Sequence, residues 1–253
     1  PFSNPWAQRL DLSVDYFNIA LDGAIGTITG PQVLNLCFNG NGTANTALSN
    51  SNNFCQQVRR DPGTGDISNI DVFLFNLGGY KTTGIDAQVN WRLPLGEVGL
   101  SDRWGQINVR AVATRLLSYE LQNRPGDPFL DYAGTIGNAQ VASGGVTKPY
   151  WRALMSVNYD VGPANLGLTW RYIGNQQAST NIGAATRAQG VHAVSYVDLN
   201  LAYKLTDRLT VFGAVNNLVD LAPQIYPAGS GSADGSTYDQ LGRRYVLRLT
   251  AKF

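Results

Sequence analysis

The last twelve residues, GRRYVLRLTAKF (residues 242–253), carry the pattern that decides the fold. From the tyrosine onward, every second residue is apolar or aromatic: Tyr245, Leu247, Leu249, Ala251 and Phe253. The residues between them include Arg244, Arg248, Thr250 and Lys252. A period of two predicts a β-strand with one apolar face. At roughly 3.3 Å per residue and a tilt of about 45°, this run spans about 28 Å, close to the hydrocarbon thickness of a membrane.

The same alternation recurs along the chain, for example in LDLSVDYFNIA (residues 10–20) and GIDAQVNWRL (residues 84–93). We predict an all-β chain with no helix and about eight strands, near residues 8–20, 69–92, 104–118, 149–161, 164–174, 193–206, 208–217 and 242–253. The second predicted strand is long for a single span. Gly78 and Gly79 mark either a bulge or the turn of a hairpin, and we favour one long strand that projects above the membrane.

Loop lengths and aromatic placement distinguish a membrane barrel from a soluble sandwich. Tight turns near residues 160–164 and 204–209 alternate with long connections near 21–68, 119–148, 174–192 and 218–241. Aromatic residues gather at strand ends, namely Trp91, Trp104, Trp151, Tyr159, Trp170, Tyr172 and Tyr203. Both features are typical of an outer-membrane barrel, with short periplasmic turns and aromatic girdles. We therefore predict a transmembrane antiparallel β-barrel.

Composition further limits the class of protein that this chain belongs to. Of 253 residues, 43% are hydrophobic and only 15% are charged, with a net charge of +1, so nothing indicates a nucleic-acid partner. No run approaches the roughly 18–20 apolar residues of a membrane-spanning helix. The single methionine is Met155, and we expect the chain to be a piece of a longer protein.

Two cysteines, Cys37 and Cys55, lie in one polar stretch rich in Asn, Ser and Gly. No histidine lies near them to complete a zinc tetrad, so the pair predicts a disulfide rather than a metal site. A disulfide implies an oxidising compartment such as a periplasm or cell surface.

Four segments in order, LDLSVDYFNIAL, GGYKTTGIDAQVNW, VFGAVNNLVDLAP and GRRYVLRLTAKF, resemble the C-terminal part of TonB-dependent outer-membrane receptors. The resemblance implies a plugged barrel of about 22 strands. Residues 1–253 would supply roughly the last eight, and the plug domain and N-terminal strands would lie outside this chain. The cysteine pair also resembles a frequent variant of this family.

The resemblance also implies a function and partners. It predicts a Gram-negative outer-membrane receptor that imports a scarce nutrient, such as a siderophore, cobalamin or an oligosaccharide. The partners would be outer-membrane lipid and the TonB complex, which would act through the missing plug. C-terminal strands of this kind are similar to the signal read by the outer-membrane assembly machinery, here Tyr245, Leu247, Leu249 and Phe253. No cofactor is implied.

Ligand binding should fall to the long loops, where several side chains have useful chemistry: Tyr119, Asp131, Tyr132, Gln176, Gln177, Arg187, Asp234 and Tyr238. No cluster of arginine and lysine marks a site for a highly anionic chelate, which favours a neutral or weakly charged ligand. We predict no enzyme, because His192 and Ser195 lack an orienting partner. Asp61 and Asp66 are too few ligands for calcium, so we predict no metal site.

Two alternatives remain open at this stage. A passive porin-like barrel would have the same strand pattern without a plug. A soluble secreted β-sandwich that binds carbohydrate would also alternate, because one face of each sheet packs on the core.

Overall fold

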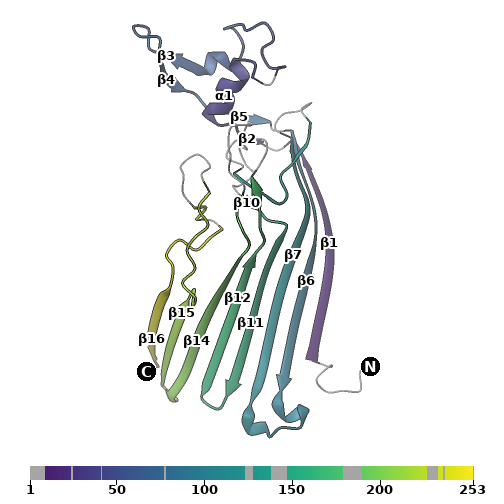
Figure 1. Ribbon diagram of the computed structural model, residues 1–253, viewed down its shortest axis with the longest axis vertical. Coiled ribbons are helices and arrows are strands. Elements are labelled where there is room, and N and C mark those ends of the chain that lie inside the picture. Colours follow the sequence, from purple (N-terminus) through teal and green to yellow (C-terminus); the bar gives the residue numbers. More distant parts are fainter. Residues whose placement is uncertain are drawn as a thin grey trace.

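A computed structural model describes residues 9–23, 25–40, 42–76, 78–122, 128–137, 147–178, 190–226, 233–235 and 237–252. Their long strands lie side by side in one antiparallel sheet (Figure 1). Its strands run in the order β1 (Leu10–Asp22), β6 (Gly79–Pro94), β7 (Gln106–Gln122), β11 (Trp151–Val161), β12 (Ala164–Ile173), β14 (Val194–Thr206), β15 (Leu209–Asn216) and β16 (Arg244–Ala251), with β8 (Leu130–Asp131) paired to β7. The predicted antiparallel barrel wall is confirmed, as an open sheet with edges at β1 and β16.

Cross-strand register places the apolar positions of the strands on one face, which we call the outer face. One row across it consists of Leu12, Val89, Ala111, Met155 and Trp170. The adjacent row, on the inner face, is polar: Asp11, Asn90, Arg110, Ser156, Thr169 and Asp198. Within the described residues no second sheet covers the outer face, and Leu12 and Leu201 are 66% and 48% exposed. This single layer is not the sandwich considered above.

The C-terminal strand also places most of its apolar residues on the outer face and its charged residues on the inner face. Tyr245, Leu247 and Leu249 pair with Val215, Gly213 and Val211 and lie on the outer face. Arg248 lies on the inner face, 5.6 Å from the centroid of the Phe212 ring. The predicted sidedness of this strand is therefore confirmed, while Phe253 lies outside the described residues.

The second predicted strand is wrong in its first half. The wall strand β6 begins at Gly79, and the residues before it form β4 (Ile67–Ile70) and β5 (Leu74–Asn76). These short strands pair with β3 (Val58–Arg60) and β2 (Ile25–Thr27), so 69–92 is neither one long strand nor a hairpin. The alternation misled us because β4 and β5 find their partners in the preceding connection.

A bulge interrupts the pairing of β6 with β7 between Thr83 and Gly84, a few residues below Gly79. A Cβ on Gly84 would meet the Phe17 ring and approach the Arg115 carbonyl oxygen to 2.8 Å, so the sheet needs glycine there. Beyond the bulge the outer face turns polar, and the hydroxyls of Thr83 and Ser118 are 2.7 Å apart. The bulge therefore marks the upper limit of the apolar outer face.

The two ends of the sheet differ as predicted. At the lower end, β11 joins β12 through Gly162 and Pro163, and β14 joins β15 through Asp207 and Arg208. There β6 joins β7 through two short 3-10 helices, Leu95–Val98 and Asp102–Trp104. Long connections gather at the other end, and the N- and C-terminal ends lie at the turn end (Figure 1).

The expected long polar loop between β1 and β6 contains a small folded unit, which lies above the sheet (Figure 1). It contains β2 to β5, helix α1 (Gly30–Cys37) and a 3-10 helix, Cys55–Gln57. Its core is built on Ile28, Val33 and Leu36, with Phe54, Val58 and Ile70 packed against them. The prediction of no helix is thus wrong here. The missed signal was Thr29 and Gln32 around Pro31, since the Gln32 Oε1 accepts the Thr29 N–H at 2.7 Å, half of a capping box.

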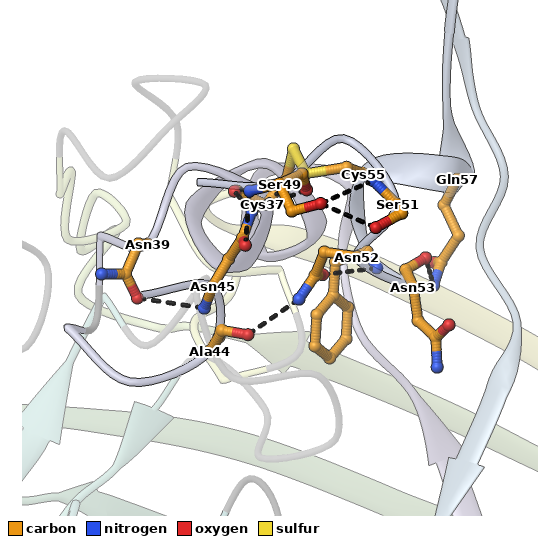
Figure 2. Close-up of a disulfide and its surroundings, with 11 residues drawn as sticks. Cys37, Asn39, Ala44, Asn45, Ser49, Ser51, Asn52, Asn53, Cys55 and Gln57 are labelled. Atoms are coloured by element: carbon orange, nitrogen blue, oxygen red, sulfur yellow. Dashed lines mark hydrogen bonds between the residues drawn. A yellow bond between two sulfur atoms is a disulfide. The ribbon is translucent and has the colours of Figure 1, made fainter. Parts of the chain in front are cut away.

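The predicted disulfide is confirmed. Cys37, the last residue of α1, is bonded to Cys55 across a separation of 18 residues. Figure 2 shows Asn45 beside the bond, where its Nδ2 donates to the Cys37 carbonyl at 2.7 Å and to the Ser49 carbonyl at 3.1 Å. The disulfide and this asparagine together hold the connection between α1 and the second half of the unit. Among the described residues, no helix is long and apolar enough to cross a membrane.

Candidate functional site

Three connections at the loop-bearing end of the sheet pack against one another. Short strands β10 (Thr147–Lys148), β9 (Thr135–Ile136) and β13 (Gln177–Ala178) form a small sheet in that order. We call the buried apolar group beside it the loop cluster, which comprises Ile136, Ile173, Val191, Val194, Tyr196, Tyr226 and Tyr238. The loops thus pack on a core that they share with the upper ends of β12 and β14, which contribute Ile173, Val194 and Tyr196.

Two predicted ligand residues, Gln176 and Tyr238, meet inside this cluster. Each is 2% exposed, and the Gln176 Nε2 donates to the Tyr238 hydroxyl at 2.8 Å. The other side of the amide accepts the Lys148 N–H at 3.0 Å. Burial raises the pKa of the Tyr238 phenol, and burial followed by nearby Arg152 lowers the pKa of Lys148. In this state both side chains brace the loops, because their polar atoms are already paired.

Asp234 lies beside the same pair. Its Oδ2 accepts the Thr147 hydroxyl at 3.2 Å, and its carbonyl accepts the Tyr238 N–H at 2.9 Å. The hydroxyls of Thr147 and Thr237 also contact each other. The final connection is therefore tied to the strand that precedes β11, a link of 87 residues in sequence.

Tyr119, Asp131 and Tyr132 form a second group at the top of β7. Tyr132 is buried against Leu121, and the Asp131 Oδ1 accepts the Tyr119 N–H at 3.0 Å. The Lys148 ammonium lies 4.2 Å from the centroid of the Tyr119 ring and so links this group to the loop cluster.

The two remaining candidates stand apart. Gln177 is exposed, and only its backbone is engaged, with its N–H donated to the Gly134 carbonyl at 2.9 Å. Arg187 lies outside the described residues. Asp131 is also exposed but its carboxylate is hydrogen-bonded, so among the described candidates Gln177 alone combines an exposed side chain with no side-chain hydrogen bond.

An inner-face group of charges lies below the loop cluster, and the sequence reasoning missed it. Arg171 pairs with Asp198 at 3.0 Å and with Asp239 at 3.6 Å, and Arg244 pairs with Asp239 at 3.0 Å. We call these four residues the inner charge cluster. The side chain of Asp239 is only 5% exposed. Arg171 and Asp198 could have been found by aligning the inner positions of neighbouring strands, but Asp239 comes from a distant loop.

The inner charge cluster borders a hollow that is also lined by Thr237 and Tyr238. Guanidinium, carboxylate and hydroxyl groups border this hollow beside the paired Tyr238 phenol, which suits a solute rich in hydrogen-bonding groups. Two arginines face two carboxylates, so the group is close to neutral. His192 is exposed in the connection before β14. Among the described residues, no group of three His, Cys, Asp or Glu side chains is placed to hold a metal ion.

Comparisons with known proteins agree on the fold. The family model described as TonB dependent receptor-like, beta-barrel matches residues 2–218, which include every wall strand except β16. No curated protein matches the sequence.

Several solved structures match over most of the chain. A mutant of the ferric enterobactin receptor PfeA from Pseudomonas aeruginosa is 17% identical, with 97% of this chain and 29% of that chain covered and a TM-score of 0.57. The siderophore receptor PirA from Acinetobacter baumannii is 15% identical, with 97% of this chain and 30% of that chain covered and a TM-score of 0.55. The FrpB iron transporter from Neisseria meningitidis is 14% identical, with 97% of this chain and 29% of that chain covered and a TM-score of 0.54. At these identities the likeness supports the fold, and the chain spans about a third of the length of these proteins.

Proposed function

The chain belongs to the TonB-dependent receptor β-barrel family, and from this premise we propose that it is part of a receptor for the energised uptake of a scarce nutrient. The family consists of outer-membrane transport receptors rather than enzymes. The observation that carries the proposal is the uncovered outer face, where one apolar row crosses all eight wall strands: Leu10, Trp91, Val109, Val157, Leu168, Leu199, Val215 and Tyr245. Such a face requires lipid around it.

We propose that the whole receptor has further strands and a plug. Both sheet edges, β1 and β16, end in open backbone, which a transmembrane barrel must pair to satisfy every N–H and C=O group. The chain covers 29–30% of the solved structures above, which supports its being part of a larger barrel. We assign it to the C-terminal part of a barrel of about 22 strands, on the resemblance of its four segments to that part of the family. Coupling to TonB would then act through the plug.

For the nutrient, we propose a metal chelate first, with cobalamin and oligosaccharides as the other classes. The similar structures include a ferric enterobactin receptor, a siderophore receptor and an iron transporter, which supports this order. The near-neutral inner charge cluster supports a weakly charged ligand. Binding would use the hollow beside Tyr238 and the open side chain of Gln177, with Tyr119, Asp131, Tyr132, Gln176, Arg187 and Asp234 as the other candidates.

The test is growth and uptake in cells that carry or lack the gene for the full-length receptor. Radiolabelled ferric catecholate, cobalamin and a maltooligosaccharide are supplied separately at limiting concentration, with and without functional TonB. The proposal expects gene-dependent uptake of one of these solutes, lost in the absence of TonB. Uptake that persists without TonB would favour the passive porin-like alternative.

A separate proposal concerns assembly. The outward positions Tyr245, Leu247 and Leu249, with Phe253, would form the signal read by the outer-membrane assembly machinery. Deletion of Phe253 from the full-length receptor should lower its outer-membrane level more than its ligand affinity. Normal membrane levels of the deletion would contradict this role.

A further inference from the structure

Arg115 is a cation in an otherwise apolar outer-face row. In this row it lies beside Ile85 of β6 and Trp151 of β11, and Tyr16 of β1 completes the row on the far side of Ile85. The row lies just below the bulge, at the level where the outer face changes from apolar to polar. An arginine facing lipid costs about 2–4 kcal/mol at the bilayer midplane but about 0–1 near the interface. Its position therefore matches the extracellular interface of the membrane.

Two aromatic rings flank the guanidinium of Arg115. Its central carbon lies 4.8 Å from the Tyr150 ring centroid and 5.1 Å from that of Trp151. Among the residues that the structure describes, Arg115 forms no ion pair. By contrast, the inner-face Arg171 and Arg244 both reach carboxylates. A half-buried guanidinium that pairs with no described carboxylate is suited to bind a phosphate group in two-point geometry.

The surface around Arg115 fits the rest of a lipid. Directly below it on the outer face lie Ala87, Ala113 and Ala153, which leave a shallow strip between Val14 on β1 and Tyr172 on β12. The Tyr172 ring stacks on Trp170, with centroids 5.6 Å apart, and so forms a rigid wall on one side. An acyl chain can lie along such a strip while its headgroup reaches Arg115.

A second cation extends the polar edge upward. Lys81 lies on the same face, four residues before Ile85 in β6 and about 13 Å above it at the usual rise of a strand. Its ammonium lies 4.0 Å from the Phe129 ring centroid. Glu120, directly across from Lys81, makes no ion pair with it.

We propose that Arg115, with Tyr150 and Trp151, forms a binding site for the phosphorylated headgroup of an outer-leaflet lipid. This inference rests on the proposed outer-membrane location of the chain and is independent of the transported nutrient. The site would fix the height of the barrel in the membrane at β7 and β11.

The test uses the full-length receptor purified in detergent and titrated with diphosphoryl lipid A, with binding followed by native mass spectrometry. Arg115→Gln should weaken binding about tenfold, the scale expected for a lost charge-assisted contact. Arg115→Lys, which keeps the charge without the fork, should lose about threefold. The matched control is Arg103→Gln, an arginine 5.8 Å from the Trp104 ring at the opposite end of the sheet, which should bind as the wild type does.

A second arm uses only the wild-type receptor, so it holds even if a variant fails to fold. The same lipid stripped of its phosphates should bind about tenfold more weakly than the phosphorylated lipid. Equal binding of the two lipids, displacement of lipid A by millimolar inorganic phosphate, or unchanged binding by folded Arg115→Gln would each overturn the proposal. Uptake and TonB dependence are measured separately, so failure of the proposed transport function would leave these readings unaffected.

Discussion

Large apolar side chains lie open on the outer face of the sheet and buried among the loops above it. Leu247 on β16 is 82% exposed, whereas Tyr238, nine residues earlier, is 2% exposed. The wall is regular and leaves its apolar surface for something outside the chain. The loops are irregular and bury their aromatic rings against one another. Apolar exposure therefore separates the part of the molecule that requires lipid from the part that is stable by its own packing.

The largest effect should come from a charge on the outer face of the wall. Ala111→Arg places a guanidinium at mid-height, where it should cost up to about 4 kcal/mol of folding free energy in the membrane. Gln88→Arg, one residue from Val89 but on the inner face, is the matched control and should cost under about 1 kcal/mol. Urea titration of the full-length receptor in lipid vesicles measures both. Equal costs would remove the distinction between the faces.

The next effect concerns the small folded unit above the sheet. Cys37→Ser with Cys55→Ser opens a loop of 18 residues, which should cost the unit about 3 kcal/mol. Because the wall shares no disulfide with this unit, its thermal unfolding should change little. Limited proteolysis should then cut between α1 and β3 in the double mutant but not in the parent. A protected loop in the mutant would mean that the core around Val33 suffices.

A smaller effect tests whether the buried loop residues stabilise the loops or contact the ligand. Tyr238→Phe removes the hydroxyl that accepts the Gln176 Nε2, and this lost buried hydrogen bond should cost about 2 kcal/mol. The control, Gln177→Ala, removes an exposed side chain and should change stability by less than about 0.5 kcal/mol. Thermal unfolding and ligand affinity are measured for both in the full-length receptor. Lost affinity with unchanged stability in Tyr238→Phe would reassign this tyrosine to direct ligand contact.

The smallest effect is a dependence on alkaline pH. Burial raises the folded-state pKa of the Tyr238 phenol, so the protonated form is favoured in the folded loops. The stability from this group is fully present below the unfolded value of about 10 and is lost as pH rises through the higher folded value. Unfolding temperatures at pH 8 and pH 11 should therefore differ less in Tyr238→Phe than in the parent. An identical difference would show that this phenol does not contribute.

The wall could be predicted from the sequence because a period of two is a local property. The predicted strand at 149–161 begins and ends within two residues of β11, Trp151–Val161. The segment at 69–92 could not be resolved, since β5 alternates like a wall strand but pairs with β2. Whether a strand joins the wall depends on its partner, which no local pattern shows.

The candidate site was less predictable for the same reason. Gln176 and Tyr238 were chosen for their chemistry in polar loops, and 62 residues separate them in sequence, so their mutual burial was not visible. Asp239 reaches Arg171 across a similar separation. Side-chain chemistry indicates what a residue is able to bind, but the fold decides whether its polar atoms are already paired.

The most direct test of the central claim is a nitroxide scan along β7 in the full-length receptor in lipid vesicles. Collision with oxygen reports contact with lipid, and collision with a water-soluble nickel chelate reports contact with water. The account predicts oxygen maxima at Ile107, Val109, Ala111 and Ala113. It also predicts that the phase shifts by one residue beyond the bulge, so that Ser118 and Glu120 face outward into water. Absence of the two-residue period, or maxima at the inner-face positions Asn108, Arg110 and Val112, would contradict it.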